Sequence, residues 1–240
     1  MRAGRFCPIR GGIVKEKYWI AKTGAGGSVL ICEGAIFLPY LHVHSWHFLW
    51  NPVIILIYMR KKIPDTMKAV IAIAPEKYRD EELAEPVAAL NKAGIAFDIA
   101  STRPGTCTGM LGGKTSAGLS FDDIDPKNYG GLIIVGGSGC QEHLWDDDLL
   151  VRLAIYFYET DKVVAAICLA PVVLARAGIL KGKKATVYDA PTAIFEMKKG
   201  RAVLTQDPVV TDGRIITANG PIAAKNFAAA VVKELSDEFW

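Results

Sequence analysis

From residue 67 onward, short apolar runs alternate with longer segments whose apolar side chains recur every three or four positions. The short runs predict buried strands, and the periodic segments predict amphipathic helices. Strands are expected at residues 68–74, 95–101, 130–137, 162–168 and 184–188, and as a pair within 201–218. Helices are expected at residues 80–94, 146–159, 169–180, 193–199 and 221–235. The Gly-rich segment 105–121 predicts a small hairpin or excursion and not another helix.

The order of these elements predicts the fold class. Strands that alternate with helices and are apolar throughout favour a mostly parallel sheet with helices on both faces. The expected architecture is a flavodoxin-like, doubly wound α/β fold. Because ligands of such sheets bind beyond the carboxyl ends of the strands, three features are expected to converge there: the loop after Ala74, the pair Gly136 and Gly137, and Cys168.

Residues 1–66 lack this patterning. A charge-free apolar run at residues 34–59 precedes the basic triplet 60–62, as in a membrane span. The run contains prolines, an asparagine and three histidines, which are costly in a lipid-facing helix. We therefore expect residues 1–66 to be an extension that is unstructured or mis-assigned, with a membrane anchor as the alternative. Residues 67–240 are expected to form the folded domain.

Composition narrows the class of protein. With 240 residues, of which 51% are hydrophobic and 22% charged, the chain is typical of a globular protein with one core. Residues 1–66 carry nine Lys and Arg against three Asp and Glu, whereas the rest carries 19 against 22, so the positive net charge does not indicate nucleic-acid binding. The five cysteines form no CxxC pair and no metal-ligand spacing. This pattern indicates reduced thiols of a cytoplasmic protein, with no metal or organic cofactor.

Four motifs carry a resemblance to a known family. They are YRDEELAEP, LIIVGGSG, AAICLAPVVLARAGIL and IITANGPIAAKNFA, in this order within residues 67–235. Together they resemble the ThiJ/PfpI superfamily, also called the DJ-one family. The resemblance implies a homodimer or higher homo-oligomer and a cysteine at a nucleophile elbow. It gives that role to Cys168, the contact with the sulfur to Glu82, and the backbone amides of the site to Gly137 and Leu169.

One position departs from the pattern of the intracellular peptidases in this superfamily. They have a histidine directly after the cysteine, where this chain has Leu169 in the run AICLAP. Neighbouring residues therefore supply no Cys–His pair, which argues against peptidase activity. After residue 66 the sequence has a single histidine, His143, which we interpret as a solvated side chain near a helix start.

The chemistry that the resemblance implies needs no histidine. A thiolate at a helix start is stabilised by the free amide groups there. A protonated Glu82, its pKa raised by burial and by the thiolate, can donate a hydrogen bond to the sulfur and shuttle a proton. The amides of Gly137 and Leu169 can hold an oxyanion. These parts suit a glyoxalase or deglycase whose substrate is a small reactive carbonyl.

Other interpretations stay open. Cys168 can serve a redox-sensing or chaperone-like stress protein, oxidised to a sulfinic acid that protonated Glu82 holds; an intracellular cysteine peptidase is a further alternative. A free cysteine is also a common packing residue, and Glu82 alone would be one member of an acidic surface. Cys107 and Cys140 are expected to be loop thiols, with Cys140 the second candidate for reactivity. Neither nucleic acid nor a membrane is an expected partner.

Overall fold

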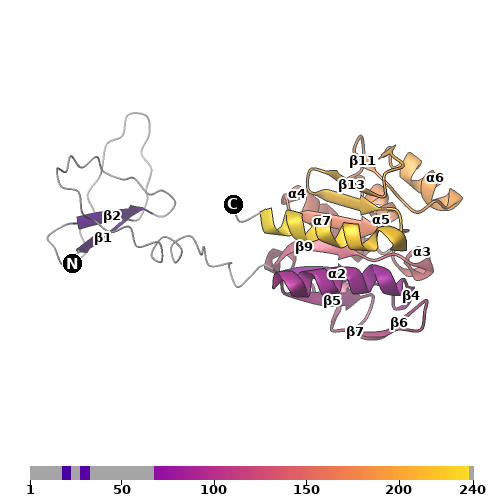
Figure 1. Cartoon of the computed structure of the whole chain (residues 1–240), viewed down its shortest axis with the longest axis horizontal. Helices are drawn as coiled ribbons and strands as arrows, with labels where there is room; N and C mark the ends of the chain where they lie inside the picture. Colours follow the sequence, from indigo (N-terminus) through magenta and orange to yellow (C-terminus); the bar gives the residue numbers. More distant parts are fainter. Residues whose placement is uncertain (1–17, 23–27, 33–67, 238–240) are drawn as a thin grey trace. The chain divides into compact units, whose positions relative to one another are not determined.

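The computed structural model describes residues 18–22, 28–32 and 68–237 (Figure 1). Towards the amino terminus, β1 (Tyr18–Lys22) and β2 (Ser28–Cys32) pair as an antiparallel two-stranded sheet. The rest of the predicted extension, including the apolar run 34–59, lies outside the described residues. The prediction about this extension therefore stays a prediction.

A seven-stranded sheet forms the centre of residues 68–237, with the strand order β13-β14-β10-β9-β3-β5-β8. Its strands are β3 (Lys68–Ala72), β5 (Phe97–Ser101), β8 (Leu119–Ser120), β9 (Tyr129–Ile134), β10 (Val163–Ile167), β13 (Val209–Asp212) and β14 (Ile215–Ala218). All neighbouring strands are parallel except β13 and β14, which form a hairpin. The predicted mostly parallel α/β sheet is confirmed.

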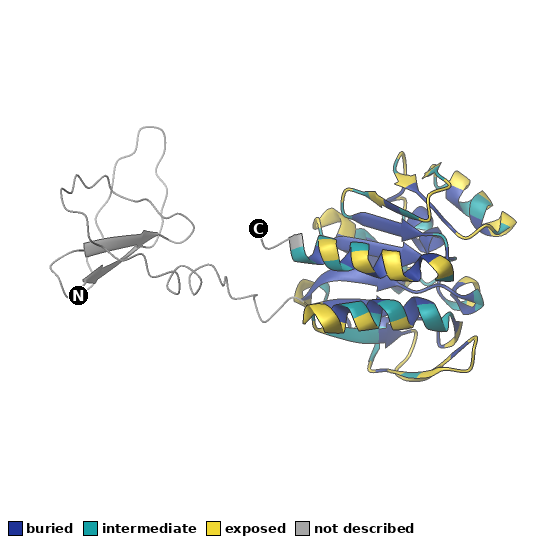
Figure 2. Cartoon of the chain, viewed as in Figure 1, coloured by how far each residue is buried: buried dark blue, intermediate teal, exposed yellow. Residues whose placement is uncertain are grey.

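Helices cover both faces of this sheet. They are α2 (Asp80–Ala93), α3 (Ser138–His143), α4 (Asp148–Glu159), α5 (Pro171–Arg176), α6 (Pro191–Lys199) and α7 (Ala224–Asp237). On one face α2 and α7 pack against each other and share a core with Ile71 and Ile133. On the other face, α4 and α5 pack with Val70 and Leu132. Successive strand residues thus enter opposite cores, which is why the central strands β3, β9 and β10 are almost entirely apolar. The strands of the central sheet are largely buried (Figure 2).

Local sequence explains the limits of α2. Acidic side chains fill its first turn, where they interact favourably with the free amides and the positive end of the helix dipole. The helix ends at Gly94, which has a φ of 71° and donates its N–H back to the carbonyls of Leu90 and Asn91. A residue with a Cβ would be strained in this left-handed conformation. The predicted helix at residues 80–94 is confirmed.

The smaller elements differ in part from the prediction. The expected hairpin within 105–121 is present as β6 (Gly105–Gly109) and β7 (Lys114–Ala117), and β4 (Glu76–Tyr78) extends it to three strands. Short 3₁₀ turns lie at Phe121–Asp123, Pro126–Asn128 and Pro221–Ala223. Among the described residues, no helix has the length and apolar character to span a membrane.

Two predicted elements are shorter than expected. The strand at 184–188 is reduced to β11 (Lys184–Ala185), which pairs with β12 (Val203–Leu204) outside the central sheet. The reason is that the amides of Thr186 and Tyr188 donate instead to the Thr217 hydroxyl and the Cys168 carbonyl. The helix predicted at 169–180 is confined to α5, because the chain turns at Gly178, whose φ is 77°.

Candidate functional site

Cys168 lies at the carboxyl end of β10, one residue beyond the strand and three before the start of α5. Its backbone φ of 63° is unusual for a residue other than glycine. Two backbone hydrogen bonds fix this conformation: the Cys168 amide donates to Ala218 O at 2.8 Å, and its carbonyl accepts from Tyr188 N at 2.9 Å. The residue is 7% exposed, so the thiol is largely removed from solvent.

The loop after β9 approaches Cys168 through Gly136 and Gly137. A Cβ at Gly136 would lie 2.6 Å from the Cβ of Cys168 and 2.7 Å from a carboxylate oxygen of Glu82, so only glycine fits between them. Gly137 has a φ of 104°, and a Cβ there would lie 2.4 Å from the Lys77 carbonyl oxygen. Close packing therefore explains both glycines, against the reactive side chains at Gly136 and against backbone at Gly137.

Glu82 comes from the first turn of α2 and is fully buried. Its Oε2 atom accepts a hydrogen bond from the Gly136 amide at 3.1 Å. The side chain also makes a hydrogen-bonding contact with Cys168. The other oxygen, Oε1, is buried and has no hydrogen-bond partner of normal geometry among the described residues. An ionised oxygen in this position is costly, whereas a protonated one can donate to the sulfur.

Burial controls the acidity of both groups. It raises the pKa of Glu82 from 4.5 to about 7, against the lowering effects of the contact with Cys168, the Gly136 amide and the charge of Arg79. Burial and the negative charge of Glu82 raise the pKa of the Cys168 thiol from 9.0 to about 12. Hydrogen bonds from the amides of Gly137 and Leu169 act in the opposite direction and lower the thiol pKa.

The pKa of Glu82 is raised, as the sequence predicts. The pKa of Cys168 is also raised, whereas the position at a helix start predicts a lowered thiol pKa. The reason is that burial disfavours the thiolate, and that removing both protons would place two negative charges in contact. The two groups therefore titrate as a pair. After one proton has left, the remaining negative charge lies either on Glu82, with one amide donor, or on the sulfur, with two.

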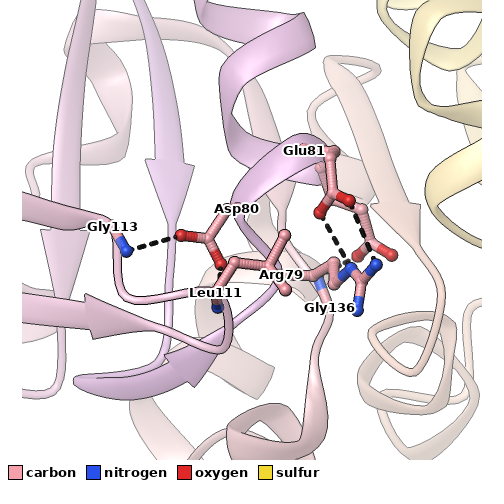
Figure 3. Close-up of polar contacts among 7 residues, drawn as sticks. Arg79, Asp80, Glu81, Leu111, Gly113 and Gly136 are labelled. Carbon is pink, nitrogen blue, oxygen red and sulfur yellow. Dashed lines mark hydrogen bonds and ion pairs between the residues drawn. The ribbon is translucent and has the colours of Figure 1, made fainter.

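Sequence reasoning missed the role of Asp80, which fastens the turn between β6 and β7 to the start of α2. Its carboxylate accepts hydrogen bonds from Leu111 N at 2.8 Å and Gly113 N at 2.9 Å, in the turn between β6 and β7 (Figure 3). A Cβ at Gly109 or Gly113 would lie 2.3 Å from the same carboxylate. Gly109 and Gly113 of the run GTCTGMLGGK therefore make room for Asp80, a signal that the sequence does contain.

Sequence reasoning also missed Arg79, which precedes α2. Its amide donates to Gly136 O at 3.1 Å, and its guanidinium faces Glu81, with Nε 2.8 Å from Oε2 and Nη2 3.0 Å from Oε1 (Figure 3). Arg79 and Glu82 thus hold the same Gly136 residue through its carbonyl and its amide.

A groove adjoins the site on the side of Leu169. The Trp145 indole donates to the Leu169 carbonyl at 2.9 Å, and Trp145 forms part of one wall. The groove has a volume of about 350 Å³ and is lined by residues from α3, α6 and the loop after α3: Gln141, Trp145, Pro191, Thr192, Phe195 and Glu196. Cys168 is not among the lining residues, and the groove is linked to the site through the hydrogen bond from Trp145 to Leu169.

Comparison with known proteins identifies the family. The model of the DJ-1/PfpI family matches residues 67–234. The chain belongs to the DJ-1/PfpI family. An uncharacterized protein of Methanocaldococcus jannaschii is 49% identical over 168 residues, which cover 70% of this chain and 82% of that protein. A deglycase of Thermococcus kodakarensis and one of Pyrococcus horikoshii are each 30% identical over 152 residues, covering 63% of this chain and 90% of theirs.

Solved structures agree with this family and with the predicted flavodoxin-like fold. A ThiJ/PfpI domain protein from Brachyspira murdochii superposes with a TM-score of 0.68 at 34% identity, covering 71% of this chain and 96% of that one. DJ-1beta of Drosophila melanogaster superposes with a TM-score of 0.64 at 26% identity, covering 70% and 90%.

Other residues considered from the sequence lie apart from this chemistry. His143 ends α3 with its side chain about one-third exposed and lies 3.9 Å from Glu142, an ion pair when the imidazole is protonated. Cys140 and Cys107 are buried in α3 and β6, so the expectation of loop thiols is wrong for both. Burial raises the pKa of Cys140 well above 9.0, which makes it a poor nucleophile. The described residues contain no group of three metal-binding side chains.

Proposed function

We propose that this chain is a cysteine-dependent enzyme of the glyoxalase or deglycase type, acting on small reactive carbonyls such as methylglyoxal. The observation that carries the proposal is the buried contact between Cys168 and Glu82, a carboxyl group whose pKa of about 7 lets it accept and donate protons at neutral pH. The deglycases among the relatives supply independent support at 30% identity.

The first step uses the state in which Glu82 is protonated and the sulfur is ionised. The sulfur attacks the aldehyde carbon of methylglyoxal, a C–S bond forms, and the carbonyl electron pair moves to oxygen. The amides of Gly137 and Leu169, which donate to the sulfur in the resting site, are suited to receive this oxyanion. Glu82 supplies the proton that neutralises the oxygen, and a hemithioacetal results.

The following steps need a base and then an acid at one position. The Glu82 carboxylate removes the proton from the former aldehyde carbon and returns it to the neighbouring carbon. The hydroxyl proton moves to the oxygen of that neighbouring carbon, which leaves a 2-hydroxy thioester on Cys168. Water then adds to the thioester, the C–S bond breaks, and lactate and the free thiol are released. Methylglyoxal plus one water gives lactic acid, so the sequence balances without an external oxidant or reductant.

One alternative has an observation in its favour. Oε1 of Glu82 is buried without a partner of normal hydrogen-bond geometry among the described residues, so a protonated Glu82 could hold a sulfinic acid formed on Cys168 in a redox sensor. Peptidase activity has no such support, because the described histidine, His143, has a partly exposed side chain beside Glu142. We further propose that the protein is a homo-oligomer, which light scattering tests directly.

The test is lactate formation from methylglyoxal by the reduced protein. Cys168→Ala should abolish turnover, whereas the matched replacements Cys107→Ala and Cys140→Ala should retain most of it. Turnover that persists in Cys168→Ala would refute the proposal. If the wild type has no turnover but Cys168 alone gains two oxygens under mild peroxide, measured by mass spectrometry, the redox-sensor function is correct instead.

A further inference from the structure

Arg79 is a charged residue next to the reactive pair that the proposed mechanism does not use. Its backbone amide bonds to the Gly136 carbonyl at 3.1 Å. A Cβ at Gly137 would lie 2.6 Å from the Arg79 nitrogen, so the main chain of Arg79 packs directly against Gly137. The amide of Gly137 in turn reaches the Cys168 sulfur. The main chain of Arg79 is therefore in contact with a residue that itself interacts with the thiol.

The guanidinium of Arg79 is only partly engaged. Nε and Nη2 face the Glu81 carboxylate, and within the described part of the chain no hydrogen bond or ion pair of Nη1 is found. The Arg79 side chain is 28% exposed and that of Glu81 is 42% exposed, so this pair reaches solvent while Glu82 beside it is buried. The charge of Arg79 interacts with both Glu82 and Cys168.

We propose that Arg79 draws carbonyl compounds that carry a carboxylate to Cys168, and that Glu81 limits this attraction by neutralising the guanidinium. The inference rests on the proposed function and names the substrate class. A guanidinium is suited to this role because it is always charged and its planar N–H groups match the two oxygens of a carboxylate. An adduct of methylglyoxal with a carboxylate-bearing thiol, such as an N-acylated cysteine, has the required chemistry.

The simpler interpretation is that Arg79 and Glu81 form an ion pair that only supports the start of α2. The two side chains are partly exposed, although Nε and Oε2 themselves are buried, and an ion pair near the surface contributes little to stability. The two interpretations differ in what Arg79 does to a charged reagent that approaches the sulfur. A structural pair affects neutral and anionic reagents equally, whereas an attracting arginine favours the anionic one.

The first experiment compares alkylation of Cys168 by iodoacetate and by iodoacetamide, which differ in one negative charge. In both reactions the sulfur forms a bond to carbon and iodide leaves, so changes in thiol pKa cancel in the ratio of the two rates. Arg79→Met should lower the iodoacetate-to-iodoacetamide ratio roughly three- to tenfold, as expected for loss of one nearby charge. Glu81→Gln should raise the ratio above that of the wild type. Arg79→Lys, which retains the positive charge, should leave the ratio close to that of the wild type.

Lys68→Met is the matched control, because it removes an equal charge at the opposite end of β3, where Lys68 lies 3.5 Å from Asp98. The ratio should not change in this variant. An unchanged ratio in both Arg79→Met and Glu81→Gln overturns the inference. Glu81→Gln leaves Arg79 in place, so it tests the inference even if Arg79→Met fails to fold.

The second experiment separates the inference from the proposed function. Hemithioacetals of methylglyoxal with N-acetylcysteine and with N-acetylcysteine amide differ only in the carboxylate. The wild type should show the higher kcat/KM with the first, and Arg79→Met should lose this preference while it keeps turnover of the second. Turnover of both adducts without a preference refutes the inference alone. No turnover of either, together with a changed alkylation ratio, refutes the proposed function alone.

Discussion

The amide of Gly136 donates a hydrogen bond to Oε2 of Glu82 across 3.1 Å, so the loop after β9 holds the carboxyl group of α2 beside the thiol. The same residue accepts a hydrogen bond from Arg79 through its carbonyl. The loop residue Gly136 therefore lies between the first turn of α2 and the end of β10 and contacts both. The reactive pair depends on this junction because its two members come from separate elements.

Gly136→Ala should disrupt this junction. The new Cβ would lie 2.6 Å from Cys168 Cβ and 2.7 Å from Glu82 Oε2, so one of the two side chains must move. We expect a loss of about 1–3 kcal/mol in the free energy of unfolding, as for other overpacked sites, together with slower turnover. Chemical denaturation measures the first effect. Gly118→Ala is the control, because nothing lies within 4 Å of its Cβ, and equal effects of the two changes would contradict the prediction.

Glu82 should make the protein less stable as the pH rises. Its pKa is about 7 in the folded state and 4.5 ordinarily, so between these values the folded protein retains a proton that the unfolded chain has lost. The contribution of Glu82 to the free energy of unfolding is then fully present below pH 4.5, falls through this window by about 3 kcal/mol, and levels off above pH 7.

Glu82→Gln removes this titration. Urea denaturation measures the free energy of unfolding of both proteins. The wild-type value minus the variant value should therefore decrease between pH 5 and pH 8. Because the negative charge is gone, the pKa of Cys168 should also fall in the variant, and alkylation should become faster while turnover becomes slower. A constant stability difference across this pH range would show that Glu82 titrates normally.

Asp80→Ala should release the turn between β6 and β7. The change removes the acceptor for the amides of Leu111 and Gly113, which are 2.8 and 2.9 Å from the carboxylate. Hydrogen exchange at these two amides should accelerate, and stability should fall by about 1–3 kcal/mol. Asp122→Ala, which removes an exposed carboxylate nearby in sequence, should leave both amides protected. Protection that persists in Asp80→Ala would mean that the turn is held by other contacts.

A chain that begins at Met67 should fold on its own. The strand and helix pattern starts there, and residues 68–237 contain both hydrophobic cores of the α/β sheet. We expect the shortened chain to unfold cooperatively in a thermal scan and to react with iodoacetamide at Cys168 at the rate of the full chain. Aggregation of the shortened chain alone would assign a structural role to residues 1–66.

The elements that the sequence predicts well are those in which local pattern and burial agree. The stripe containing Leu83 and Leu90 faces one core, as an amphipathic helix requires. Parallel strands end at one edge of the sheet, so the positions of Cys168 and Gly136 could be inferred once the strands were recognised. The contact of Glu82 with the thiol, by contrast, was inferred from family resemblance and not from pattern.

Features that depend on distant parts of the chain were not predictable in this way. Asp80 is 31 residues from Leu111, and its role becomes visible only when the hairpin folds over the start of α2. The run GGSGC resembles a loop in sequence, yet Cys140 enters the core because α3 starts immediately after Gly137. The amide of Tyr188 could pair with a strand but bonds to the Cys168 carbonyl instead.

The left-handed backbone at Cys168 sets a limit on how this position can change. A φ of 63° costs a residue with a Cβ about 1 kcal/mol, and glycine would avoid that cost. The hydrogen bonds to Ala218 and from Tyr188 use only the main chain, so glycine could keep them. Relief of backbone strain alone would therefore favour glycine here, so the thiol is held in place at a cost to the main chain that its packing in the core has to offset.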